Sequence, residues 1–169
     1  SLDVSNNVYL KELQCDKNQL TELDLSENAD LEILYCGDNP YKHLDFSHNT
    51  SLKELKIFRS GLTYLDLSKN VSLKLLSIFK NNFKEIDLSN NVALEFLSCS
   101  ENQFTSLDLT NNIGLKTLWC SKNQLTSLDV SNNISLDGLD CAENQLTSLD
   151  VRNNIALEGL RFELNQITD

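Results

Sequence analysis

Leucine recurs every 21 residues along the chain, and no insertion or deletion breaks the register. Within each unit, apolar residues occupy positions one, four and six, and the same spacing returns at positions eleven, fourteen and sixteen. A fixed period of this length predicts a solenoid, in which each repeat is one coil stacked on its neighbours. We therefore predict a single repeat domain over residues 1–169, with partial repeats at both ends and units that begin at Leu10, Leu31, Leu52, Leu73, Leu94, Leu115, Leu136 and Leu157.

Each half of the unit alternates apolar and polar positions before it ends at an asparagine. The segment from Leu115 to Asn123 shows this pattern, and the segment from Leu125 to Asn133 repeats it. Period-two alternation closed by asparagine is typical of a short strand followed by a turn. About ten residues are also too few for a strand, a helix and two connections. We therefore predict a mostly β fold with two short extended segments per coil, a parallel sheet and little or no helix.

Asparagine occupies positions nine and nineteen of the unit throughout, except at Ser60. Stacked coils about 4.8 Å apart place equivalent residues in columns that run the length of the solenoid. We expect the asparagine side chains to lie inside the corners, where their amides bond to backbone groups that the turns leave unpaired.

The repeat L-x-x-L-x-C-x-x-N-x-L is the leucine-rich-repeat signature. With cysteine at position six and L-T-x-L-D-L-S-x-N behind it, the unit resembles the repeats of internalin J-like bacterial surface proteins, over all 169 residues. The resemblance implies a secreted or wall-anchored adhesin. That family's wall-sorting signal and N-terminal cap do not occur in this sequence, and neither does a signal peptide. We therefore expect a fragment of a longer protein, or two copies that stack end to end through uncapped coils as a homodimer.

Net charge sets limits on the partners. The chain carries a formal charge of −11, which disfavours nucleic acid and anionic lipid. No run of apolar residues is long enough to span a membrane, so membrane insertion is not expected. The charge is uneven, because the stretch from Lys42 to Lys84 is basic within an otherwise acidic chain.

All five cysteines fall at position six, where isoleucine or phenylalanine stands in the remaining units. A residue that alternates with isoleucine acts as a small hydrophobe. Side chains stacked in one column run parallel, which is poor geometry for a disulfide. The spacing also fits no common zinc site. We predict buried free thiols.

Position fifteen forms a column of aspartates, in which neighbouring charges about 5 Å apart repel by roughly 0.8 kcal/mol. Hydrogen bonds from nearby serine, threonine or backbone groups are the favoured explanation for how this repulsion is offset. Calcium binding along the column is the weaker alternative, since one straight column gathers few ligand oxygens. The candidate calcium residues are Asp24, Asp45, Asp66 and Asp87.

No catalytic pattern stands out. His43 and His48 are the only histidines, and no grouping of serine, histidine and aspartate, no H-E-x-x-H motif and no glycine-rich phosphate loop occurs. We predict that the protein is not an enzyme and uses no cofactor.

Outward positions two, three, five, seven and eight of the first strand are mostly small or charged, with a few large exceptions in the middle of the chain. Aromatic residues mixed with cations are typical of a contact surface. The predicted partner-binding residues are Tyr35, Lys56, Phe58, Arg59, Leu75, Phe79, Lys80, Phe96 and Trp119.

Three functions remain open from the sequence. The favoured one is a module that binds a protein ligand, which the basic stretch suggests is acidic. The alternatives are a carbohydrate or anionic-polymer binder, in which the aromatic rings stack on sugars, and a passive structural spacer.

Overall fold

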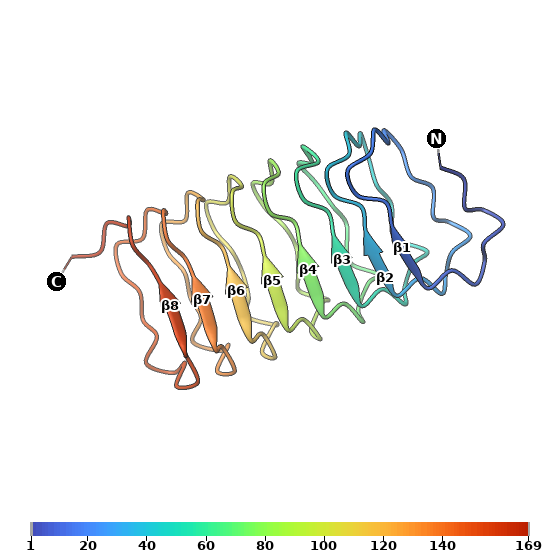
Figure 1. The fold of residues 1–169 in the computed structure, drawn as a ribbon. Coiled ribbons are helices and arrows are strands. Elements are labelled where there is room, and N and C mark those ends of the chain that lie inside the picture. The colour runs from blue at the N-terminus through green and yellow to red at the C-terminus, as the bar shows by residue number, and fades with distance from the viewer. Residues whose placement is uncertain (1, 169) are drawn as a thin grey trace.

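In the computed structural model, which describes residues 2–168, each 21-residue unit forms one coil with a three-residue strand at positions three to five. The strands pair in parallel as one eight-stranded sheet in sequence order, and each residue pairs with the residue 21 positions later. Figure 1 shows the strands side by side, with the two termini at opposite ends of the row. The strands are β1 Glu12–Gln14, β2 Ile33–Tyr35, β3 Glu54–Lys56, β4 Leu75–Ser77, β5 Phe96–Ser98, β6 Thr117–Trp119, β7 Gly138–Asp140 and β8 Gly159–Arg161.

The predicted parallel leucine-rich-repeat solenoid is confirmed, and residues 2–168 contain no helix. The second half of each coil differs from the first, because positions fourteen to sixteen form no sheet although their side chains alternate inward and outward. The middle residue of that segment is aspartate, and its carboxylate accepts a hydrogen bond from a backbone N–H two residues later. These N–H groups are therefore satisfied within their own coil.

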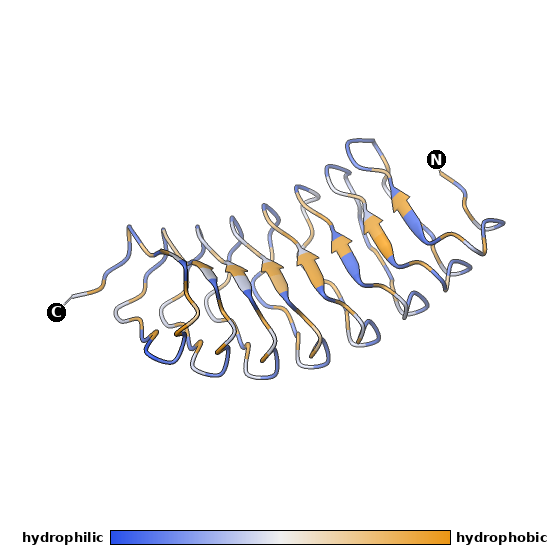
Figure 2. Ribbon diagram, turned by 60° about the horizontal axis from the view of Figure 1, so that its bottom comes forward, coloured by the Kyte–Doolittle hydropathy of each residue, from blue (hydrophilic) through white to orange (hydrophobic). Residues whose placement is uncertain are grey.

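The inward columns form one continuous core. Leu34, Leu55, Leu76 and Leu97, at position four of successive coils, are all 0% exposed. Figure 2 shows orange, apolar positions along the coils between blue, hydrophilic turns. At the last coil the same inward position is open, since Leu160 is 39% exposed and no coil packs on β8 within the described residues. End-to-end pairing of two copies stays a prediction.

Position eight turns the chain out of the strand through a left-handed backbone conformation. All eight residues at this position have φ between 51° and 58°, and none of them is glycine. The turn is held by the next coil, because the N–H of Lys17 donates to the carbonyl of Gly37 at 2.9 Å and later coils repeat this bond. The asparagine that follows at position nine then points into the coil.

Two asparagine columns connect each coil to the one before it. At position nine, the amide of Asn102 donates to the carbonyls of Ile78 and Cys99, and its Oδ1 accepts from the N–H of Phe83. At position nineteen, the amide of Asn112 donates to the carbonyls of Leu88 and Asn91. The predicted role of both asparagine columns, as partners of corner backbone groups, is confirmed.

Ser60 interrupts the first asparagine column because its side chain has no amide. The N–H of Tyr41 donates to the carbonyl of Asn39 in its own coil, at 3.0 Å, whereas the N–H of the equivalent Leu20 donates to the side chain of Asn39 in the next coil. The following Gly61 has φ of 71°. The third coil therefore lacks the position-nine side-chain bonds to the second coil that Asn81 makes between the fourth coil and the third.

We predict that Asn112→Ala lowers the free energy of unfolding by about 1–3 kcal/mol, because two buried hydrogen bonds to the carbonyls of Leu88 and Asn91 are lost. Urea denaturation followed by circular dichroism measures the change. Asn111→Ala is the matched control, since Asn111 is exposed and makes one hydrogen bond, to Ser89. Equal stability of the two variants would contradict a structural role for the column.

Candidate binding site

The side chains at positions three, five and seven point outward from the sheet and form a surface that we call the strand face. Its aromatic residues meet in pairs across neighbouring coils. The rings of Phe58 and Phe79 stack with centroids 5.1 Å apart. The ring of Phe96 meets that of Trp119 edge to face at 5.0 Å. Four of the predicted contact residues are thus held in fixed orientations by one another.

Gly37 provides the space that the stacked pair needs. A Cβ atom at this position would lie 2.7 Å from the ring of Phe58, closer than van der Waals contact allows. The ring of Phe58 is therefore packed between the backbone at Gly37 on one side and Phe79 on the other.

Tyr35 and Lys56 form the next part of the strand face. The ammonium of Lys56 lies 3.9 Å from the centre of the Tyr35 ring, a cation–π contact. The Tyr35 hydroxyl donates to a carboxylate oxygen of Glu54 at 2.6 Å, and this bond raises the pKa of the phenol to about 12.

A hollow of about 390 Å³ opens in the middle of the strand face over β3 to β7. Five of the nine predicted contact residues line it, and it is mainly apolar. Four further residues line it that were not among the predicted contact residues: Ser77, Ser98, Ser100 and Asp140. In the sequence, a hollow could have been recognised from small side chains that stand between large ones in one column. This pattern indicates a hollow only when the coils are stacked so that these residues are neighbours. The five predicted residues at the hollow are Lys56, Leu75, Phe79, Phe96 and Trp119.

Arg59 and Lys80 lie outside the hollow. Both occupy the left-handed turn at position eight, where Arg59 pairs with Asp38 at 3.8 Å and Lys80 pairs with Glu101 at 3.5 Å. Lys53 and Lys74 at position two are paired in the same way, and Lys53 lies 2.6 Å from Glu32. The basic stretch is therefore partly neutralised by acids on adjacent coils, and it presents less positive charge than its composition suggests.

The cysteine column is buried, and all five thiols are free, as predicted. Removal from water disfavours a thiolate. Burial accordingly raises the pKa of Cys99 to about 12 and that of Cys141 to about 11. At neutral pH the column is protonated and behaves as part of the core.

The aspartate column is exposed, and each carboxylate is held by the residue two positions later. Asp108 accepts the backbone N–H of Thr110 at 3.0 Å, and this bond, followed by that of the threonine hydroxyl, lowers the pKa of Asp108. Asp150 has a pKa of about 2, mainly because the Arg152 side chain donates to it. These hydrogen bonds provide the offset to charge repulsion that the sequence analysis favoured.

Within residues 2–168, no three carboxylate, histidine or cysteine side chains lie close enough together to hold a metal ion. The calcium alternative for the aspartate column therefore has no ready-made cage in the described chain. The same residues also contain no helix long and apolar enough to cross a bilayer.

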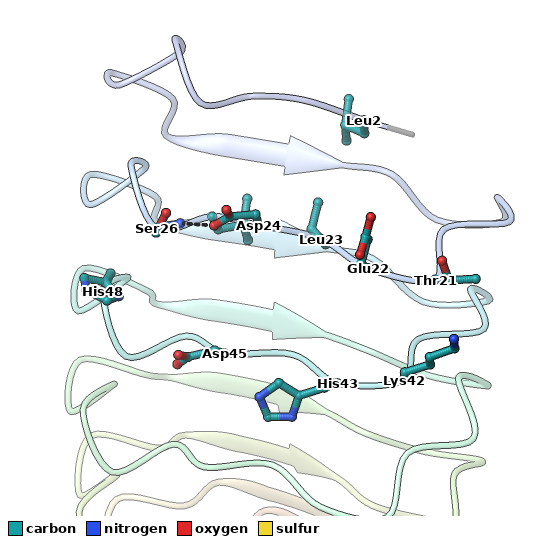
Figure 3. A pocket seen from close by; sticks show the side chains of 11 residues that line it. Leu2, Thr21, Glu22, Leu23, Asp24, Ser26, Lys42, His43, Asp45 and His48 are labelled. Carbon is teal, nitrogen blue, oxygen red and sulfur yellow. Dashed lines mark hydrogen bonds between the residues drawn. The ribbon is translucent and has the colours of Figure 1, made fainter.

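A larger hollow, of about 650 Å³, lies over the second halves of the first two coils, and Figure 3 shows its lining. His43 and His48 lie on opposite sides of Asp45, and Ser26 donates to Asp24. All of these side chains are exposed to solvent. The hollow therefore holds no desolvated polar group that could fix a ligand.

Ser47 and His48 are in contact, with Oγ and Nδ1 3.2 Å apart, but they do not form a catalytic relay. Asp45 accepts the backbone N–H of Ser47 and makes no hydrogen bond to either imidazole within residues 2–168. The two side chains are neighbours on an exposed turn, where no adjacent group orients the histidine as a base.

Parallel coils with an inward leucine at positions one and four, a cysteine column and two asparagine columns make the chain a leucine-rich-repeat protein. It closely resembles the functional domain of InlJ from Listeria monocytogenes, whose structure includes a cysteine ladder: sequence identity is 37%, the TM-score is 0.97, and the match covers 100% of this chain and 38% of that one. The chain is thus an internalin-like leucine-rich-repeat domain.

Two further solved structures show the same fold. A leucine-rich-repeat protein from Leptospira interrogans is 25% identical with a TM-score of 0.91, over 98% of this chain and 46% of that one. Internalin C2 from Listeria monocytogenes is 25% identical with a TM-score of 0.82, over 91% and 71%. The chain therefore spans less than half the length of the first two proteins. No protein-family profile and no curated protein matches the sequence.

We predict that the cysteines do not react with a thiol reagent such as Ellman's reagent in the folded protein, since burial both blocks access and disfavours the thiolate. All five are expected to react after denaturation in guanidinium chloride, measured by absorbance. Rapid labelling of the native protein would contradict the buried, protonated column.

We predict that acid destabilises the fold through the aspartate column. Because the pKa values of these carboxylates are lowered from 3.8 in the folded state, their stabilisation is complete above that value and is lost as pH falls through the folded pKa, about 2 for Asp150. Melting temperature measured between neutral pH and strong acid tests this, and Asp108→Asn should lose part of the acid sensitivity.

Calcium titration at neutral pH is the companion measurement: a rise in melting temperature that Asp66→Asn removes would restore the calcium alternative.

Proposed function

We propose that the protein is a non-enzymatic binding domain whose strand face contacts a protein partner. The observation that carries this proposal is the mainly apolar hollow of about 390 Å³ on the strand face, bounded by Phe79, Phe96 and Trp119. Trp119 is 47% exposed although its ring is fixed against Phe96. Rigid, partly exposed aromatic side chains supply much of the affinity in protein interfaces, because little conformational entropy is lost when they are covered.

The surroundings of the hollow support a protein ligand. Ion pairs such as Lys53–Glu32 and Lys74–Glu95 lie at position two, beside the strand face, and form a polar rim to the apolar centre. A polar rim around an apolar centre is the usual anatomy of a protein interface. The similarity to InlJ and to internalin C2 supports a secreted or cell-surface location for this binding.

Carbohydrate binding is the second candidate, and one observation favours it. A second open hollow of about 460 Å³ adjoins the first at Trp119 and Asp140, and Gly138, Gly159 and Arg161 also line it. Gly138 and Gly159 place no side chain in this hollow, and Asp140 and Arg161 offer polar groups beside the Trp119 ring. A flat ring beside hydrogen-bonding side chains suits a sugar.

We predict that Trp119→Ala weakens partner binding about tenfold or more, because Trp119 is the most exposed of the aromatic side chains around the hollow. The wild type and the variant are compared on an array of extracellular proteins and on a glycan array, with affinities then measured by surface plasmon resonance. Tyr64→Ala is the matched control, since Tyr64 is 66% exposed and lies away from the strand face.

Each outcome of this comparison has a distinct meaning. Binding to a protein that Trp119→Ala weakens and Tyr64→Ala spares supports the proposal. Binding to glycans alone supports the second candidate, and absence of any ligand supports a structural spacer. Equal loss in both variants would show that the strand face is not the site.

A further inference from the structure

The hollow on the strand face owes its shape to residue size along position five. Lys56 and Trp119 are long or bulky, and between them stand Ser77 and Ser98 in β4 and β5. These two serines form the floor, while Leu75 and Phe96 at position three and Phe79 at position seven form the walls. The column therefore has a gap two coils long between Lys56 at one end and Trp119 at the other.

The floor of the hollow carries two hydroxyls without partners. Ser77 and Ser98 are 7% and 5% exposed, and neither side chain makes a hydrogen bond within the described residues. The nearby Ser100 differs, because its hydroxyl accepts from Ser121 at 3.1 Å. Both hydroxyls line the hollow and are accessible from it, so a polar group of a ligand can bond to them.

Charge at the rim is asymmetric. Within the described residues, 2–168, Lys56 forms no ion pair. Its ammonium lies over the Tyr35 ring. At the opposite end, Asp140 lies 3.6 Å from Arg161, so its negative charge is already partly compensated. An anionic group of the ligand is therefore favoured near Lys56.

We propose that the hollow receives a tyrosine side chain of the protein partner, with the phenol hydroxyl bonded to Ser77 and Ser98 and an acidic residue of the partner beside Lys56. This inference rests on the proposed function and names the residue of the partner that enters the site. A phenol has an apolar body and a polar tip, which match the walls and the floor. A phenylalanine or leucine fills the same walls but leaves both hydroxyls unsatisfied.

Small phenols test this proposal without the partner. Binding of 3-(4-hydroxyphenyl)propionate, 3-phenylpropionate and 3-(4-hydroxyphenyl)propionamide is measured by NMR chemical-shift titration of the whole chain. The hydroxylated acid should bind about fivefold more tightly than the phenyl acid, as one net hydrogen bond predicts. It should also bind more tightly than the amide, which lacks the negative charge.

Variants assign the preference to particular side chains. Ser77→Ala combined with Ser98→Ala should make the hydroxylated and phenyl acids bind equally, and Lys56→Gln should reduce binding of the acids but not of the amide. Ser106→Ala is the control, since Ser106 is exposed and lies at position thirteen, away from the strand face. Backbone N–H chemical shifts that stay unchanged in coils distant from each substitution verify that each variant is folded.

The results separate this inference from the proposed function. Equal affinity of the wild type for the phenyl and hydroxylated acids, or no shifts at the hollow with any probe, would overturn the tyrosine assignment. If Trp119→Ala still weakens a protein partner in that case, the proposed function stands without it. If the partner also fails to respond to Trp119→Ala, both are wrong.

Discussion

Side-chain amides that bond to the backbone of the preceding coil are the interaction on which this structure depends. The strands are only three residues long, so the corner carbonyls depend on turn N–H groups, as those of Leu88 and Asn91 do, and on side-chain donors. Asn102 and Asn112 show how two columns provide them: each amide reaches a carbonyl of its own turn or of the previous asparagine, and another carbonyl 24 residues earlier. The coils are thereby fixed in register, and every outward column inherits that register.

The binding surface is a direct product of this regularity. Because the scaffold contacts use inward and corner positions, residues at positions three, five and seven can vary in size without disturbing the stack. Two serines between a lysine and a tryptophan are enough to form a hollow. One glycine, Gly37, leaves the space that the ring of Phe58 occupies. Side chains that are far apart in sequence, such as Phe96 and Trp119, meet because their coils are adjacent.

The sequence predicted the fold well because each column repeats the same residue type. An error in the assumed register would have mixed apolar and polar residues within a column. Leu34 and its equivalents, the thiols of position six and both asparagine columns lie where the pattern placed them. The candidate site was harder to predict. Arg59 and Lys80 looked like free cations, but their partners Asp38 and Glu101 lie 21 residues away on neighbouring coils. Ser77 and Ser98 were not recognised as site residues. A small side chain indicates a hollow only when large side chains flank it on the adjacent coils. The predicted binding role of the nine residues stays a prediction.

The constant 24- and 21-residue separations of the asparagine bonds also determine how such a chain can change length. A coil is joined to its neighbours through the same atoms at every step, so removing or duplicating one whole unit recreates the bonds at the junction. A change that is not a multiple of 21 residues, and is not looped out of a turn, shifts asparagine, leucine and cysteine out of their columns for the rest of the chain. The length of such a domain therefore changes in steps of one coil. A binding surface can be lengthened or shortened by whole coils while the hydrogen bonds within and between the remaining coils are preserved.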